Sequence, residues 1–239
     1  MALVLGTDAR CIVPSSNPLQ RTRGSIPAEP KLQAAQLEPM PEIAHIYRVE
    51  LLGIEPLVWR RIRVPASYSF WDLHVAIQDA MGWLDYHLHL FRTRNPTTGR
   101  IDQIGIPCEE GSLDGQRCRA GWETPIAQYF ARPDDRANYG YDFGDDWQHT
   151  ISLEAIVEVE QGDAILACLA GERTCPPEDC GGVHGYEHLL RALSVPTHPE
   201  HAAMLAWVGD DFDPEGFAPD RVRFDDPRER WKGAFENAT

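Results

Sequence analysis

The residues best suited to chemistry lie in one short stretch, from Tyr141 to His149. It includes three acids, three aromatic residues, one glycine and one histidine. Carboxylates and an imidazole that lie close together can hold a divalent cation, which then activates a water molecule. The candidate binding residues in this stretch are Asp142, Asp145, Trp147 and His149.

A second dense stretch runs from Cys168 to Tyr186 and contains two prolines, four glycines and three cysteines. This composition predicts a fixed irregular loop. The alternative roles of its thiols are zinc ligation and packing as small hydrophobic groups. The spacing Cys-x6-Cys-x4-Cys-x3-His differs from the Cys-x2-Cys of zinc knuckles. The candidate zinc ligands are Cys168, Cys175, Cys180 and His184.

Three further residues of the second stretch, Glu178, Asp179 and Tyr186, complete the candidate binding residues. Both stretches combine glycine, acidic and aromatic residues on irregular backbone, and such backbone carries function when a sheet holds it in place. We therefore predict that the two stretches meet in one concave site, with Glu178 and Asp179 facing Asp145 or His149.

Alternating side chains predict the strands that hold the first stretch. These strands form a hairpin. Its first strand has Tyr139, Tyr141 and Phe143 on the apolar face. Its second strand has Trp147, His149, Ile151 and Leu153 on the same face. Glycine and aspartates at 144–146 form the turn, because they tolerate the backbone angles that turns need. His149 is then either a hydrogen-bonded core residue or a ligand.

Other elements can be predicted along the chain. Residues 43–51 and 58–65 read as an antiparallel pair of strands. A helix follows over 69–82, with a shortened capping box at Ser69 and a stop at Gly82. His87 and His89 share one face of the next strand, where they are half-exposed structural residues or two ligands of one metal ion.

Two features complete the predicted elements. Arg60, Arg61 and Arg63 form a compact basic cluster, with Arg60 on the opposite face from the other two, and we interpret it as a solvated strand edge. After Gly185, two amphipathic helices are predicted. The apolar face of the second consists of Ala203, Met204, Trp207 and Val208.

Composition indicates one ordered domain between two tails. Residues 1–42 contain scattered prolines that match no helix or strand period, so we expect a disordered tail. Residues 43–224 form the expected domain. Residues 225–239 are expected to be a loosely ordered C-terminal tail.

The charge narrows the range of partners. The chain of 239 residues has 37 acidic and 22 basic residues, a formal net charge of −15. A surface with this charge repels phosphate backbones, so a protein partner is expected rather than free nucleic acid. There is no apolar run of membrane-spanning length and no secretory signal, so we expect a cytoplasmic protein that does not enter membranes.

Several motifs in fixed order resemble the plasmid pRiA4b Orf-three-like family, whose members include passenger proteins of mobile elements. The matching segments are 56–61, 77–83 with His87 and Leu88, 141–149, and 175–182 with Gly185 and Tyr186. The resemblance covers about residues 43–217. It implies an α+β fold, a roll-like mixed or antiparallel sheet with helices packed on it in a single domain, and no established activity.

The resemblance also bears on the zinc set. In many members the position of Cys180 is a valine, which weakens a site that needs all three cysteines, whereas Cys168 and Cys175 fit the family pattern. The coordination of a metal ion would then have to be completed by other residues, for example His149, Glu178 or Asp179.

Two functions compete at this point. The one we favour is a non-catalytic binding module associated with plasmids or mobile elements, because the chain has no nucleophile–base pair, P-loop or Rossmann fingerprint. The alternative is a metal-dependent hydrolase or nuclease-like enzyme that uses the Asp, His and Glu cluster.

Overall fold

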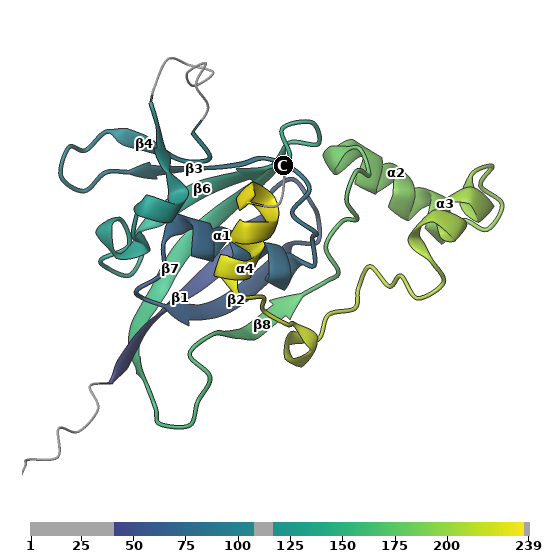
Figure 1. Ribbon diagram of the computed structural model, residues 1–239. Coiled ribbons are helices and arrows are strands. Elements are labelled where there is room, and N and C mark those ends of the chain that lie inside the picture. The colour runs from purple at the N-terminus through teal and green to yellow at the C-terminus, as the bar shows by residue number, and fades with distance from the viewer. Residues whose placement is uncertain (1–40, 108–116, 237–239) are drawn as a thin grey trace, which may run out of the picture. The chain divides into compact units, whose positions relative to one another are not determined.

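The computed structural model describes residues 41–107 and 117–236, whose strands form one eight-stranded sheet. The strand order is β5-β4-β3-β6-β7-β1-β2-β8. Neighbouring strands are antiparallel except β4 and β5, which are parallel, so the sheet is mixed. Helix α1 lies across one face of this sheet, and α4 lies over α1 (Figure 1). The predicted α+β fold is confirmed.

The strands are β1 (Glu42–Leu51), β2 (Val58–Pro65), β3 (His89–Arg94), β4 (Ile101–Gly105), β5 (Cys118–Ala120), β6 (Arg136–Tyr141), β7 (Trp147–Val159) and β8 (Ala167–Glu172). The α-helices in the described part are α1 (Phe70–Met81), α2 (Gly182–Ser194), α3 (His201–Val208) and α4 (Pro227–Trp231). Short helical turns are η1 (Gly121–Glu123), η2 (Ile126–Gln128), η3 (Pro219–Arg221) and η4 (Lys232–Glu236).

Strand β7 is central because it pairs with β1 on one side and β6 on the other. All four of its predicted core-facing side chains are buried, as alternation requires. On β6 the prediction holds for Tyr139 and Tyr141 but is wrong for Phe143, which is 49% exposed. The strand ends at Tyr141, and Asp142 turns the chain with a φ of 53°, so Phe143 points out of the turn.

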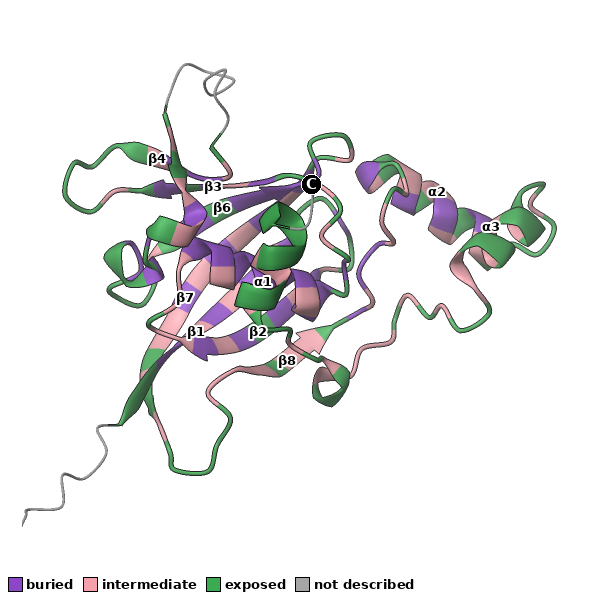
Figure 2. Cartoon of the chain, in the orientation of Figure 1, coloured by how far each residue is buried: buried purple, intermediate pink, exposed green. Residues whose placement is uncertain are grey.

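Helix α1 begins and ends where its local sequence predicts. The Ser69 side chain accepts a hydrogen bond from the Asp72 backbone, and the Asp72 carboxylate accepts one from the Ser69 backbone. Gly82 ends the helix with a φ of 88°, a conformation that glycine adopts without strain. Most of the helix is buried, as Figure 2 shows in purple. The helix thus covers the core and leads directly into the loop before β3.

The interpretation of Arg60 as part of a solvated strand edge is wrong. Strand β2 lies between β1 and β8, and Arg60 is 1% exposed. Its guanidinium donates to the carbonyl oxygens of Ala80 (2.8 Å) and Glu172 (2.9 Å) and lies 3.7 Å from the ring centroid of Phe217. The buried charge is thus compensated by carbonyl dipoles and an aromatic face.

The two predicted tails have different outcomes. Residues 1–40 lie outside the described residues, and β1 begins at Glu42. The predicted loose C-terminal tail differs from the structure, which is helical over 227–236. Trp231 packs edge-on against Trp71 with ring centroids 5.4 Å apart, and Arg230 pairs with Asp79 at 2.6 Å. Packing of these side chains onto α1 orders this segment.

Two further predictions need correction. The chain from Cys168 to Glu172 belongs to β8 and α2 begins at Gly182, so the irregular loop is confined to 173–181. The predicted apolar face of α3 is not a buried face, since no residue of this helix is buried. In the described part of the chain, every helix is too short or too polar to cross a membrane.

Candidate functional site

The two dense stretches meet, as predicted. The Gly181 amide donates to the Asp145 carboxylate at 3.0 Å, and the Tyr141 hydroxyl donates to the Glu178 carboxylate at 2.9 Å. A Cβ atom at Gly182, which has a φ of 66°, would collide with the Asp145 carbonyl oxygen. Glycine at this position therefore allows the start of α2 to approach the β6–β7 turn.

The side chain at the centre of this contact is His87, not His149. Its Nε2 atom lies 3.0 Å from Asp179 Oδ1, 3.5 Å from Asp142 Oδ2 and 4.0 Å from Glu178 Oε2. The sequence places His87 in a strand beside His89, but β3 starts only at His89. His87 belongs to the preceding loop, so the two histidines point to different places and the idea that they share one metal ion is wrong.

Asp142 is fixed by its own turn. One oxygen, Oδ1, accepts from the Gly144 amide at 2.8 Å, which leaves Oδ2 directed toward His87. The Asp142 amide donates to the Leu88 carbonyl at 3.0 Å and so ties the turn to the loop before β3. Asp142 and Asp179 both have positive φ, 53° and 56°. Such strained backbone in non-glycine residues clusters at functional sites.

Glu178 is held by donors on one oxygen only. Its Oε1 accepts from the Leu84 amide and the Tyr141 hydroxyl, both at 2.9 Å. Burial, together with the charge of Glu178, raises the pKa of Tyr141, so the hydroxyl keeps its proton and acts as donor. The second oxygen, Oε2, is buried and has no hydrogen-bond partner. A buried acceptor in that state is costly unless a cation or a water molecule binds it.

His87 Nε2 faces this oxygen and is also buried without a partner that has hydrogen-bond geometry. Its 3.0 Å approach to Asp179 is therefore a close contact and not an aligned hydrogen bond. The ligand atoms of His87, Asp142 and Asp179 all lie within 4.8 Å of one another. One imidazole nitrogen and nearby carboxylate oxygens form a donor set for a divalent transition-metal ion. Asp179, whose side chain is 69% exposed, leaves one side open to solvent.

Three of the predicted binding residues lie in the core beneath this site. Trp147, His149 and Tyr186 are each 0% exposed. Burial lowers the pKa of His149 to about 4, and its Nδ1 atom lies 3.2 Å from the Tyr139 carbonyl oxygen. His149 is thus the neutral, hydrogen-bonded core histidine that was one of its two predicted roles.

The four candidate zinc ligands do not gather. Cys168 lies on β8, Cys175 is buried in the loop, and His184 on α2 has a side chain that is 97% exposed. In the described residues, the groups with mutually close ligand atoms include none of these four. Burial raises the pKa of Cys180 to about 12 and also raises that of Cys175. These thiols pack as small hydrophobic groups.

A buried cluster of His74, Asp85 and His89 lies close by and was missed by sequence reasoning. The two imidazole rings stack, with centroids 3.5 Å apart and an interplanar angle of 14°. Stacked rings cannot both direct in-plane lone pairs at one ion, so this cluster does not serve as a metal centre in this arrangement. His74 instead bridges the Tyr139 hydroxyl and the Asp85 carboxylate, each at 2.8 Å. The network anchors the loop that carries His87.

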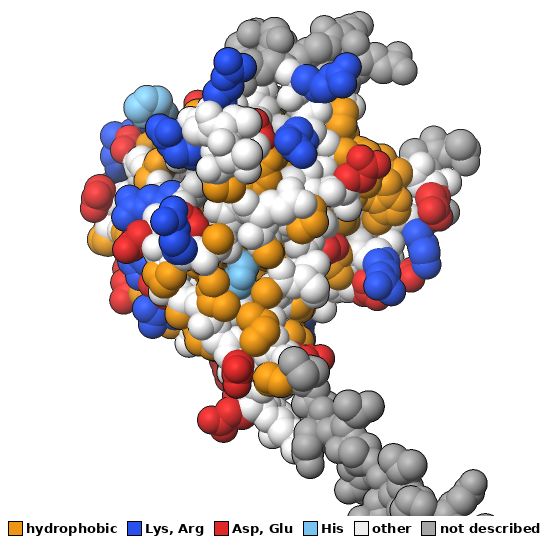
Figure 3. Space-filling model, turned by 90° about the vertical axis from the view of Figure 1, so that its left-hand side faces the viewer, with side chains coloured by type: hydrophobic (Ala, Val, Ile, Leu, Met, Phe, Trp, Pro, Cys, Tyr) orange, Lys and Arg blue, Asp and Glu red, His pale blue; other side chains and the backbone are white. Residues whose placement is uncertain are grey.

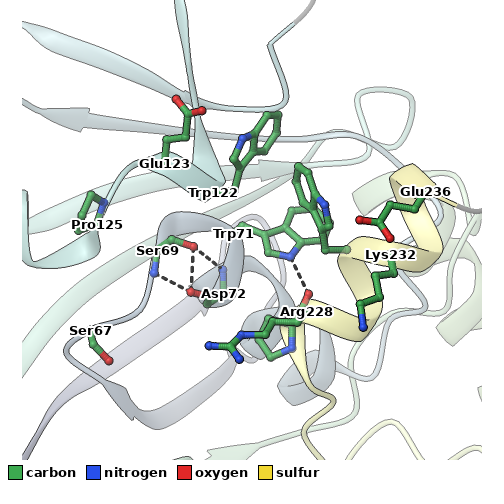
Figure 4. A pocket seen from close by; sticks show the side chains of 12 residues that line it. Ser67, Ser69, Trp71, Asp72, Trp122, Glu123, Pro125, Arg228, Lys232 and Glu236 are labelled. Carbon is green, nitrogen blue, oxygen red and sulfur yellow. Dashed lines mark hydrogen bonds between the residues drawn. The ribbon is translucent and has the colours of Figure 1, made fainter.

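A separate pocket of about 420 Å³ lies between the start of α1, η1 and α4 (Figure 4). Trp71, Trp122 and Trp231 line it, and the Trp71 indole donates to the Pro227 carbonyl at 3.0 Å. None of the predicted site residues lines this pocket.

The comparisons with known proteins agree with this fold. Residues 44–221 match the family model described as "Plasmid pRiA4b ORF-3-like protein". The uncharacterized protein y4hQ of Sinorhizobium fredii is 36% identical over 170 residues, which cover 68% of this chain and 79% of the relative. The crystal structure of MM3350 from Methanosarcina mazei, a protein of unknown function, matches with a TM-score of 0.69 and 42% identity over 77% of this chain and 99% of that one. The chain therefore belongs to the plasmid pRiA4b ORF-3-like family.

Proposed function

We propose that this protein binds a divalent cation through His87, Asp142, Glu178 and Asp179 and uses it to activate water for hydrolysis. One observation carries the proposal. His87 Nε2 and Glu178 Oε2 are buried without hydrogen-bond partners and lie 4.0 Å apart, beside carboxylate oxygens of Asp142 and Asp179. A cation bound between these atoms would satisfy both.

The donor set indicates the type of cation. Calcium takes six to eight oxygen ligands, whereas an imidazole mixed with carboxylates suits manganese, iron or zinc. Three carboxylates more than balance a charge of +2, so the cation and its site together stay weakly negative. A metal-bound water on the open side beside Asp179 would have a lowered pKa and could act as a nucleophile near neutral pH.

A second candidate function is the non-catalytic binding module. It is favoured by exposed apolar side chains on the loops that carry His87 and Asp142. Leu84 is 61% exposed, Tyr86 70% and Phe143 49%. In that case the cation would order the two loops and take no part in a reaction.

Titration with Mn²⁺, followed by electron paramagnetic resonance, tests the cation site. We expect Asp142→Asn to weaken binding by at least about tenfold, because it removes a ligand charge. Pulsed measurements should detect an imidazole nitrogen on the bound Mn²⁺, and His87→Gln should abolish that signal. Asp210→Asn, at an exposed acid outside the site, is the matched control and should change affinity less than about twofold.

Two results would refute the cation site: wild-type protein that binds no Mn²⁺, or an Asp142→Asn variant that binds it as well as wild type. Hydrolysis is tested separately with chromogenic esters, anilides and phosphodiesters in the presence of Mn²⁺. Binding without turnover of any of them favours the second candidate function.

A further inference from the structure

Helix α3 is apolar but unburied. Its sequence, HAAMLAWV, has no polar residue after His201, yet none of its residues is buried and Trp207 is 49% exposed (Figure 2). A helix that is apolar on all sides is normally covered by protein. Exposed apolar surface of this kind marks sites of interaction.

This helix forms one wall of a pocket that reaches the candidate cation site. The pocket has a volume of about 260 Å³ and is lined by Leu189 of α2, by Met204 and Trp207 of α3, and by Asp179. Asp179 also provides the carboxylate oxygen closest to His87 Nε2, at 3.0 Å. The apolar surface of α3 is therefore continuous with the site.

A second pocket borders the site through the loop before β3. It has a volume of about 720 Å³ and is lined by Trp83, Leu84 and Tyr86 on one side and by α4 on the other. The Leu84 amide donates to the Glu178 carboxylate at 2.9 Å, and the Tyr86 amide donates to the Tyr141 hydroxyl oxygen at 3.1 Å. The exposed side chains of this loop thus belong to residues whose backbone is bonded to the site.

The charges of the residues that line both pockets indicate which class of molecule can bind there. Asp179 lines the first pocket. In the second, the acids Asp85, Asp225, Asp226 and Glu229 outnumber the one cation, Arg230, which is already paired with Asp79 and Asp225. With a net charge of −15, this lining disfavours nucleic acid, an anionic membrane and a second copy of the same chain. The side of the molecule seen in Figure 3, which faces away from α2 and α3, has basic side chains interspersed with acidic ones. Apolar surface with acidic groups suits a polypeptide that carries apolar and basic side chains.

We propose that an extended segment of such a polypeptide docks across this surface, from α3 past His87 to Leu84 and Tyr86 in the loop before β3. The proposal goes beyond the cation site, because apart from Asp179 the docking contacts come from side chains that bind no cation. If the proposed hydrolysis takes place, this polypeptide is its substrate class.

Fluorescence anisotropy with labelled peptides of about twelve residues, which extend to ~40 Å, tests the docking. The probes alternate Leu with Lys, Leu with Glu, and Ser with Lys. We expect the Leu–Lys peptide to bind at least about tenfold more tightly than the other two, since only it complements both the apolar and the acidic lining. Trp207→Ser and Tyr86→Ser should each weaken it about fivefold or more. Both side chains are exposed, so neither change removes core packing.

Ile101→Ser is the matched control, because Ile101 is 47% exposed on β4 and lines neither pocket. The proposal is overturned by equal binding of the Leu–Glu peptide, by an equal loss in the control, or by no binding of any probe. Dimerisation that Trp207→Ser abolishes would make a second copy the occupant, and Trp207-dependent binding to anionic vesicles would make it a lipid surface. Both results overturn it. Binding measured without Mn²⁺ and in Asp142→Asn separates failure of docking from failure of the cation site.

Discussion

Three aspartates adjacent to the site or within it, Asp85, Asp142 and Asp179, take positive φ, between 53° and 60°. Each directs its carboxylate to a histidine, at distances of 2.8 to 3.5 Å. Strained backbone and closely spaced carboxylates lower the stability of a protein. They cluster at functional sites, where the strain is part of the function. This pattern distinguishes the site from an ordinary acidic turn.

The loss of stability caused by such a carboxylate can be measured at Asp85. Burial raises its pKa to about 6, against smaller opposite effects from His89 and Arg230, and its side chain is 11% exposed beside His74. The folded state thus binds the proton more tightly than the unfolded state, so Asp85 lowers stability as pH rises from about 4 to about 6. Between pH 4.5 and pH 7, we expect the free energy of unfolding of Asp85→Asn to rise by about 2 kcal/mol relative to that of wild type.

Urea unfolding of both proteins at the two pH values measures this difference. Asp163→Asn, at an exposed acid, is the control and should show no such gain. Parallel pH profiles for wild type and Asp85→Asn would show that the pKa of Asp85 is not raised in the folded protein.

At the scale of elements, β7 is the strand on which the site depends. It places Trp147 in the core directly after the acidic turn, and Trp147 lies 6.1 Å from the ring of Trp83 at the end of α1. Strand, turn and helix end therefore share one packed layer under the candidate cation site. A shift in this layer would move Asp142 relative to His87.

The Trp147→Ala variant tests this role. A fully buried indole predicts a loss of about 3–5 kcal/mol, a large part of the ~5–15 kcal/mol that stabilises a typical domain. We expect little soluble protein, and a strongly lowered urea midpoint for what remains. Trp207→Ala, at an exposed tryptophan of α3, should change stability by no more than about 0.5 kcal/mol. A midpoint of Trp147→Ala close to wild type would contradict the central position of β7.

At the scale of the whole molecule, the C-terminal segment closes one side of the structure. Residues 227–236 lie beyond the stretch that matches the family model, which ends at residue 221. Arg230 links this segment to Asp79, a nearly buried carboxylate that also accepts from the Asp225 amide at 2.9 Å. The segment therefore covers α1 through a few specific contacts.

We expect Arg230→Ala to release this segment, because Asp79 would lose its cation while remaining buried, at a cost of about 1–3 kcal/mol. Hydrogen exchange of amides 227–236 should become several-fold faster, and the fluorescence of Trp71 and Trp231 should shift to the red. Arg228→Ala on the same helix, whose side chain lines the open pocket of Figure 4, is the matched control. Equal protection of the segment in both variants would show that the ion pair does not hold it.

The sequence by itself determined the elements with strong local patterns. Alternation predicted β1 and β2, as well as β7 with its buried face, and the capping box and Gly82 predicted both ends of α1. These signals are local because strand alternation and helix capping act over a few residues. The meeting of the two dense stretches could also be predicted, from their shared composition.

Only the tertiary structure decided which side chains face one another. His87 and Asp179 are 92 positions apart (179 − 87), and no periodicity relates them. Alternation placed Arg60 on the opposite face from Arg61 and Arg63, but it could not show that β8 would pair with β2 and bury it. Likewise, the composition of residues 225–236 did not show that they would pack against Trp71 of α1. A local pattern sets the direction of a side chain, whereas the element that packs against it is set by the path of the whole chain.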